Sequence, residues 1–176
     1  MVRKNGHAVS NPVSSRVERA IEEYLSMMIG KGVVALNIIP DRNWNITDAT
    51  QKKTKLGNLY DAVALAKKLD LPLNIGTEMN AHGQKLVDDF DATELAPVRS
   101  AFIDGAFFIY GHTQMERWLG MGYQSDWAKS MLPTRSAKND FYRRVGHLLT
   151  PGEAACNLSD PQMREKHPAE IIKQLG

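Results

Sequence analysis

The stretch Leu73-Asn74-Ile75-Gly76-Thr77-Glu78-Met79-Asn80 decides the fold, because it follows the pattern of an earlier stretch. That stretch, Leu36-Asn37-Ile38-Ile39-Pro40-Asp41-Arg42-Asn43, lies at a constant offset of 37 residues. In each copy an apolar run leads to an acid, and an asparagine follows two positions later. A helical pattern separates the copies, so the order is that of one βαβ unit. The alternative is a chance similarity, with the acids stabilising the starts of the next helices.

A βαβ unit predicts one shared edge where polar side chains gather. In open α/β sheets and in barrels, chemistry lies at the carboxyl ends of the parallel strands. We therefore expect one rim to carry Asp41, Arg42, Asn43, Glu78 and Asn80. Asp41 and Glu78 are candidate catalytic groups or metal ligands, because two nearby carboxylates can separate each other's pKa values. Arg42, Asn43 and Asn80 are candidate substrate-binding residues, since a guanidinium offers a planar fork to an anion.

A third strand is predicted over residues 106–110, which are rich in strand-forming aromatic side chains. It would end at Gly111-His112-Thr113 and bring His112 to the same rim. Histidine is the usual acid or base near neutral pH, so His112 is a third candidate catalytic residue. The alternative is a helical pair between His112 and Glu116, four residues further on.

Helical patterns fill most of the remaining chain. They cover about 15–29, 48–69, 92–104, 125–131, 136–149 and a last stretch after 159. We expect residues 1–12 to be a flexible arm and 13–176 to be one α/β domain. The predicted fold class is α/β with parallel βα units. It is either the C-terminal part of a TIM-like barrel or a small layered α/β domain with extra C-terminal helices.

Composition narrows the class of protein. The chain is 43% apolar and 24% charged with a net charge of +2, which is typical of a globular protein and gives no argument for a nucleic-acid partner. No apolar run approaches the roughly 20 residues of a membrane span, and no apolar signal core is visible at the start. The single cysteine, Cys156, excludes an internal disulfide and a cysteine-cluster metal site. We expect a cytoplasmic protein.

Several short motifs point to a family. Residues 73–80 are similar to a strand that reads Leu-His-Ile-Gly and ends in Asn. Further pieces follow in matching order: Gly120-Met121, Ser125-Asp126, Arg135 and Phe141-Tyr142-Arg143-Arg144. Together these motifs resemble the closing segment of uronate isomerases in the amidohydrolase superfamily. The resemblance spans about residues 58–146, with gaps.

The resemblance implies the C-terminal part of a metal-dependent TIM-barrel enzyme. Such an enzyme would be a hydrolase or isomerase that uses a divalent metal, zinc or manganese, on a small anionic sugar acid. Two departures stand against a complete site: Asn74 replaces the family's strand histidine, and the chain has no His-x-His motif. On its own the chain could not assemble that family's full metal site.

The alternative function is a non-catalytic interaction or oligomerisation domain. Its contact surface would be an exposed cluster formed by Trp118, Met121, Tyr123 and Trp127. In both cases a short parallel sheet leaves a strand edge open. We expect a second copy of the chain or a partner chain to cover that edge.

Overall fold

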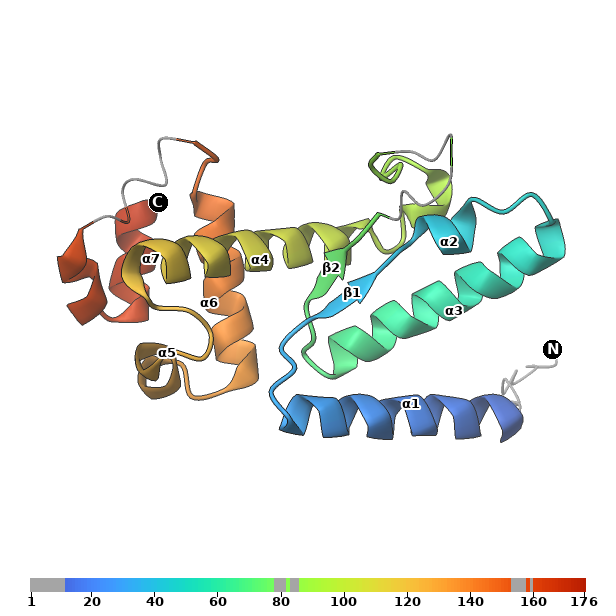
Figure 1. Ribbon diagram of the computed structural model, residues 1–176, viewed down its shortest axis with the longest axis horizontal. Coiled ribbons are helices and arrows are strands. Elements are labelled where there is room, and N and C mark those ends of the chain that lie inside the picture. The colour runs from blue at the N-terminus through green and yellow to red at the C-terminus, as the bar shows by residue number, and fades with distance from the viewer. Residues whose placement is uncertain (1–11, 78–81, 83–85, 153–157, 159) are drawn as a thin grey trace, which may run out of the picture. The chain divides into compact units, whose positions relative to one another are not determined.

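The computed structural model describes residues 12–77, 82, 86–152, 158 and 160–176, without the side chains of residues 12–18. The chain divides into two compact units, Met1–Val34 and Ala35–Gly176. The element order is shown in Figure 1. Most of the predicted flexible arm, residues 1–12, lies outside the described residues.

The described part of the first unit is a helix, α1 (Pro12–Gly30), which begins slightly before the predicted range. Its end is closed by the backbone N–H of Val33, which donates to the carbonyl of Met28 at 3.1 Å. Gly32 has a φ of +100°, a conformation that glycine adopts without steric cost.

The second unit contains the predicted βαβ unit. Strands β1 (Leu36–Ile38) and β2 (Leu73–Ile75) are parallel, and Leu36 pairs with Leu73. The pairing offset therefore equals the offset of the sequence pattern. Helices α2 (Asp41–Trp44) and α3 (Ala49–Lys68) lie between the strands in the chain. Asp48 caps α3 as its residue type predicts, accepting a hydrogen bond from the Gln51 N–H at 2.7 Å.

The two faces of this sheet differ in character. Leu73 is buried, and Leu36, Ile38 and Ile75 are half-buried. Successive side chains of a strand point to opposite faces, so Asn37 and Asn74 share the other face, where both are exposed. The Asn74 amide donates to Asn37 Oδ1 at 2.9 Å across the two strands.

One long helix, α4 (Arg99–Leu119), occupies the region where a third strand was predicted, so the strand over 106–110 is wrong. Its buried positions recur every three or four residues: Phe102, Gly105, Phe108, Gly111, Met115 and Leu119. Gly105 does not end a helix but allows α4 to touch β2. A Cβ at this position would lie 2.8 Å from the carbonyl carbon of Leu73. Burial of one helical stripe thus overrides the local strand propensity.

Helix α4 packs closely on α6 (Arg135–Leu148) at a pair of glycines. A Cβ on Gly111 would lie 2.6 Å from the backbone nitrogen of Gly146, and one on Gly146 would lie 3.0 Å from that of Gly111. The two backbones therefore pack directly against each other. Met115, Tyr142 and Val145 are fully buried beside this crossing.

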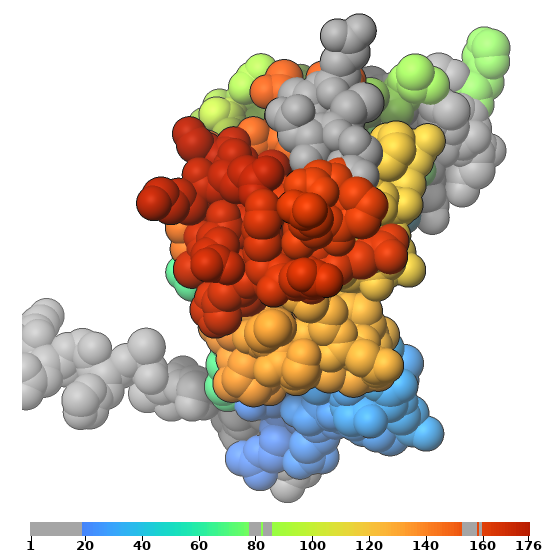
Figure 2. Space-filling view, turned by 90° about the vertical axis from the view of Figure 1, so that its left-hand side faces the viewer, coloured from blue at the N-terminus to red at the C-terminus, as the bar shows by residue number. Residues whose placement is uncertain are grey.

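Short elements complete the described part of the second unit. They are η1 (Thr93–Leu95), α5 (Asp126–Met131), η3 (Pro161–Glu165) and α7 (Pro168–Leu175). Figure 2 shows η3 and α7, in dark orange and red, over the end of the α4 and α6 pair. Met163 and Ile171 from these elements are fully buried.

The described residues are thus mostly helical around a small parallel sheet, which agrees with a small α/β domain. Two of the three predicted strands are present, and the described part of the chain does not form a barrel. No helix in this part is both long and apolar enough to cross a membrane.

Candidate functional site

Three of the predicted rim residues lie at the carboxyl end of β1, because α2 begins there. Asp41 is half-buried in the first turn of α2, and its Oδ1 accepts a hydrogen bond from Asn45 Nδ2 at 3.0 Å. Asn43 Nδ2 donates to the Ile39 carbonyl at 3.2 Å. Arg42 is exposed. Glu78 and Asn80, which follow β2, lie outside the described residues.

The contacts of Asp41 and Asn43 are compatible with both interpretations of the repeated sequence pattern: a shared rim of functional residues, or acids that stabilise the starts of helices. Asp41 stabilises the turn that follows α2, and its position near a helix N-terminus is electrostatically favourable. The Asn43 amide satisfies a backbone carbonyl at the end of the strand. Neither hydrogen bond requires a catalytic role, and the side chains of Asp41 and Asn43 both remain partly exposed.

Asp88 is the acid at this end of the sheet that sequence reasoning missed. It is 6% exposed, and it is the one charged residue among the buried residues of the described chain. Its Oδ1 accepts hydrogen bonds from Trp44 Nε1 at 2.9 Å and from the Asp89 N–H at 2.8 Å. Its Oδ2 is also buried and has no hydrogen-bond partner among the described residues. A buried carboxylate oxygen without a partner is energetically costly.

Trp44 fixes where this carboxylate lies. The indole belongs to α2, directly after β1, whereas Asp88 belongs to the segment that follows β2. Their hydrogen bond therefore joins the chain segments that leave the two strands.

The segment after Asp88 is held at several points, which limits how far the carboxylate can move. Arg99 Nε donates to the Phe90 carbonyl at 2.8 Å, and the Tyr60 hydroxyl donates to the Glu94 carbonyl at 2.6 Å. Lys52 forms an ion pair with the Glu94 side chain. The hydrogen bond from Lys52 lowers the pKa of the Glu94 carboxyl, with smaller contributions from the backbone and the lysine charge.

His112 does not lie at a strand end, because the predicted strand is part of α4. Its ring packs beside two aromatic rings that also contact each other, 6.4 Å from the centroid of Phe108 and 5.5 Å from that of Tyr142. Burial lowers the pKa of His112, and the charge of Glu116 partly opposes this effect. His112 is therefore a half-buried neighbour of the α4 and α6 packing, in line with the helical alternative.

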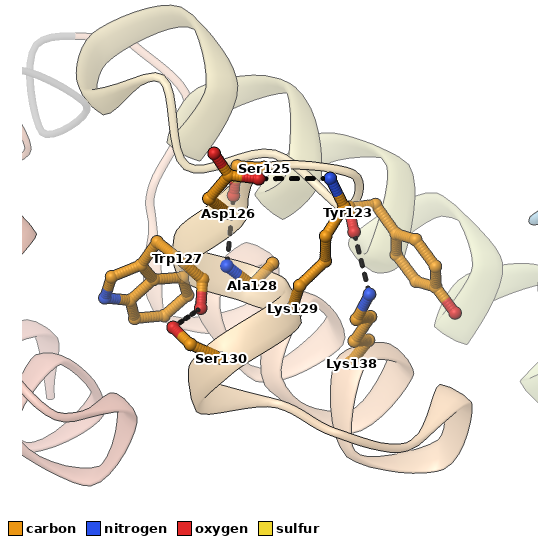
Figure 3. A network of polar contacts seen from close by, with 8 residues as sticks. All are labelled: Tyr123, Ser125, Asp126, Trp127, Ala128, Lys129, Ser130 and Lys138. Carbon is orange, nitrogen blue, oxygen red and sulfur yellow. Dashed lines mark hydrogen bonds and ion pairs between the residues drawn. The ribbon is translucent and has the colours of Figure 1, made fainter.

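The predicted contact surface is mostly interior. Met121 is 2% exposed and Tyr123 is 5% exposed, and Trp118 and Trp127 are half-buried, so the exposed cluster is wrong. Figure 3 shows Lys138 beside Tyr123, where its Nζ donates to the Tyr123 carbonyl at 3.1 Å. Lys138 Nζ also lies 4.9 Å from the ring centroid of Tyr123. The aliphatic part of the Lys138 side chain thus lies along the apolar surface of Tyr123.

A cleft of about 310 Å³ lies at the opposite, amino end of β2. Its apolar lining includes Leu71, Leu73 and Phe108. Its charged lining is mixed in sign: Lys67, Asp70, Asp104, Asp140 and Arg143. Arg143 is engaged there by Asp140 at 2.7 Å and by Asp104 at 3.6 Å. The pair with Asp104 links α4 to α6, whereas the pair with Asp140 lies within α6. The lining therefore has no charge of a single sign that would select a ligand.

Comparisons with protein-family models, with curated proteins and with solved structures found no match. The described residues contain no group of three or more His, Cys, Asp or Glu side chains placed to hold a metal ion. The candidate site therefore depends on its own geometry: the carboxyl ends of β1 and β2, with Asp88 buried between the segments that leave them.

Proposed function

We propose that the chain is an enzyme, or a portion of one, that acts as a hydrolase or isomerase on a small anionic, sugar-acid-like molecule. The site is the rim at the carboxyl ends of β1 and β2. The observation that carries the proposal is the buried Asp88 carboxylate, which has one oxygen held by two hydrogen bonds and one buried oxygen without a partner among the described residues. In the barrel that the resemblance implies, β1 and β2 would be two neighbouring strands.

Each rim residue has a role in this proposal. Asp88 is assigned the role of acid or base, because its Oδ2 has no hydrogen-bond partner among the described residues. Arg42 is exposed at the same rim and binds the anionic group of the substrate. Asp41 and Glu78 remain candidates for the second acid or base, and Asn43 and Asn80 for substrate contacts. His112 keeps its proposed catalytic role only if the substrate reaches α4.

A divalent metal is part of the family resemblance. Zinc or manganese would bind carboxylate and imidazole groups, and Asp88 Oδ2 is an available carboxylate oxygen. The described residues do not fit a complete site, since they offer no set of three ligands. We therefore derive no step through a metal, and elemental analysis of the purified protein tests its presence directly.

The test compares Asp88→Asn with Asp91→Asn, an identical chemical change a few residues away. Asp91 is exposed and lies 3.4 Å from Arg99. In Asp88→Asn the new amide oxygen can still accept from Trp44, and the buried charge is gone, so this variant should fold with an unchanged or higher Tm. We expect Asp88→Asn to lose turnover on a panel of uronic and aldonic acids, and Asp91→Asn to retain it.

Two results would contradict the proposal. One is a wild-type protein that neither turns over any sugar acid nor gains Tm from one. The other is Asp88→Asn with wild-type turnover, which would make the buried carboxylate merely structural.

A further inference from the structure

At the outer edge of β1, the backbone N–H and C=O of Asn37 have no hydrogen-bond partner among the described residues of the second unit. The Leu36 N–H donates to the Pro72 carbonyl at 3.0 Å, and the Gly76 N–H donates to the Ile38 carbonyl at 2.8 Å. Leu36 and Ile38 therefore face β2. Because successive residues of a strand alternate in direction, the N–H and C=O of Asn37 point away from β2, toward the open edge.

The other parts of the sheet edge are closed. Helix α4 lies against the outer edge of β2, where Gly105 touches the backbone of Leu73. At the end of β1, the Ile39 carbonyl already accepts a hydrogen bond from Asn43 Nδ2. Within the described part of the second unit, what remains open is a short edge with Asn37 at its middle, and such an edge is a template for strand addition.

We propose that a second copy of this chain pairs with this edge, antiparallel, across a two-fold axis that passes beside Asn37. Each copy then gives its Asn37 N–H to the Asn37 carbonyl of the other. Antiparallel strands exchange both bonds in this way between directly opposed residues. A two-fold axis closes the assembly at a dimer, whereas parallel pairing of two copies would leave a free edge. This proposal does not depend on the proposed catalytic function.

Charge and side chains favour the same occupant. Residues 33–39 contain no charged side chain, so two copies of this run meet without repulsion. On the exposed face, Asn74 already donates to Asn37. In the dimer the two Asn37 side chains would be neighbours on that face, and a row of four amides would cross the sheet. Amide side chains offer both donors and acceptors, so each can bind the next.

The experiment introduces a charged side chain at position 37, beside the proposed two-fold axis. Asn37→Lys and Asn37→Glu keep every backbone bond to β2, and position 37 is exposed, so both variants should fold. Opposed Cα atoms would be about 5.5 Å apart in the dimer. Like charges there should weaken dimerisation roughly three- to tenfold at low salt. An equimolar mixture of the two variants should restore or exceed wild-type dimerisation, measured by sedimentation velocity across a concentration series.

Asn74→Lys is the matched control, since it lies one strand further from the axis. Its two copies would be separated by three strand spacings, about 14 Å, which exceeds the screening length of roughly 10 Å at 0.1 M salt. We expect this variant to dimerise like the wild type. A wild-type chain that stays monomeric would overturn the proposal and leave the edge for a strand of another protein. So would an Asn37→Lys variant that dimerises like the wild type, or a mixture that does not recover.

Discussion

Replacing Gly111 with alanine should strongly destabilise the second unit. The added Cβ would lie 2.6 Å from the backbone nitrogen of Gly146 and closer still to the carbonyl oxygen of Tyr142. Both are backbone atoms of α6, so no side chain can rotate away and the helices must separate. Overpacking of this kind costs about 1–3 kcal/mol or more. The better helix propensity of alanine returns only about 0.5–1 kcal/mol.

The net expectation is a loss of about 2 kcal/mol in the free energy of unfolding, measured by urea denaturation followed by circular dichroism. Gly57→Ala in α3 is the matched control, because a Cβ at that glycine meets no atom within 4 Å. It should gain up to about 1 kcal/mol from propensity alone. If Gly111→Ala proves as stable as Gly57→Ala, the direct packing of α4 on α6 is not as described.

Two further predictions concern the interior around α4. Tyr142→Phe should lower the free energy of unfolding by about 1–3 kcal/mol, because the buried hydroxyl donates to the Met121 carbonyl at 2.8 Å. Tyr110→Phe is the control: its hydroxyl is exposed, so the variant should be nearly neutral in the same denaturation assay. Burial lowers the pKa of His112, so below about pH 6.5 the unfolded chain takes up a proton that the folded chain resists. Stability should therefore fall as the pH drops below the unfolded-state pKa of about 6.5, and His112→Phe should reduce this fall. Equal slopes of stability against pH for both proteins, measured by urea denaturation, would contradict the assignment.

The βαβ unit was predictable because its signal is repeated in the sequence. The constant spacing of Asn37 and Asn74 and of the apolar residues beside them predicted two parallel strands, and the observed register has the same offset. The third strand failed for the opposite reason. Residues 107–110 favour a strand locally. The helix is favoured by tertiary contacts that the sequence does not reveal, those of Gly105 with β2 and of Gly111 with α6.

The candidate site was predictable only in part. The position of Asp41, Arg42 and Asn43 follows from the end of β1. The burial of Asp88 depends on Trp44, which is 44 residues away in the chain. Asp88 is followed by two more acids, Asp89 and Asp91, so nothing in the local sequence singles it out. The burial of Tyr123 likewise depends on tertiary contacts, such as the packing of its ring on Phe108 and on Tyr142, each 5.9 Å away between centroids.

The hydrogen bond between Asn37 and Asn74 also favours the observed register of β1 and β2. If β2 shifted by one residue relative to β1, Asn74 would move to the face of the sheet where Leu73 is now buried. A buried amide without a hydrogen-bond partner costs roughly 1–3 kcal/mol. A slip of two would keep the sides correct but separate Asn74 from Asn37 and break their bond. The strands are only three residues long, so this one pair does much to select a single arrangement among several.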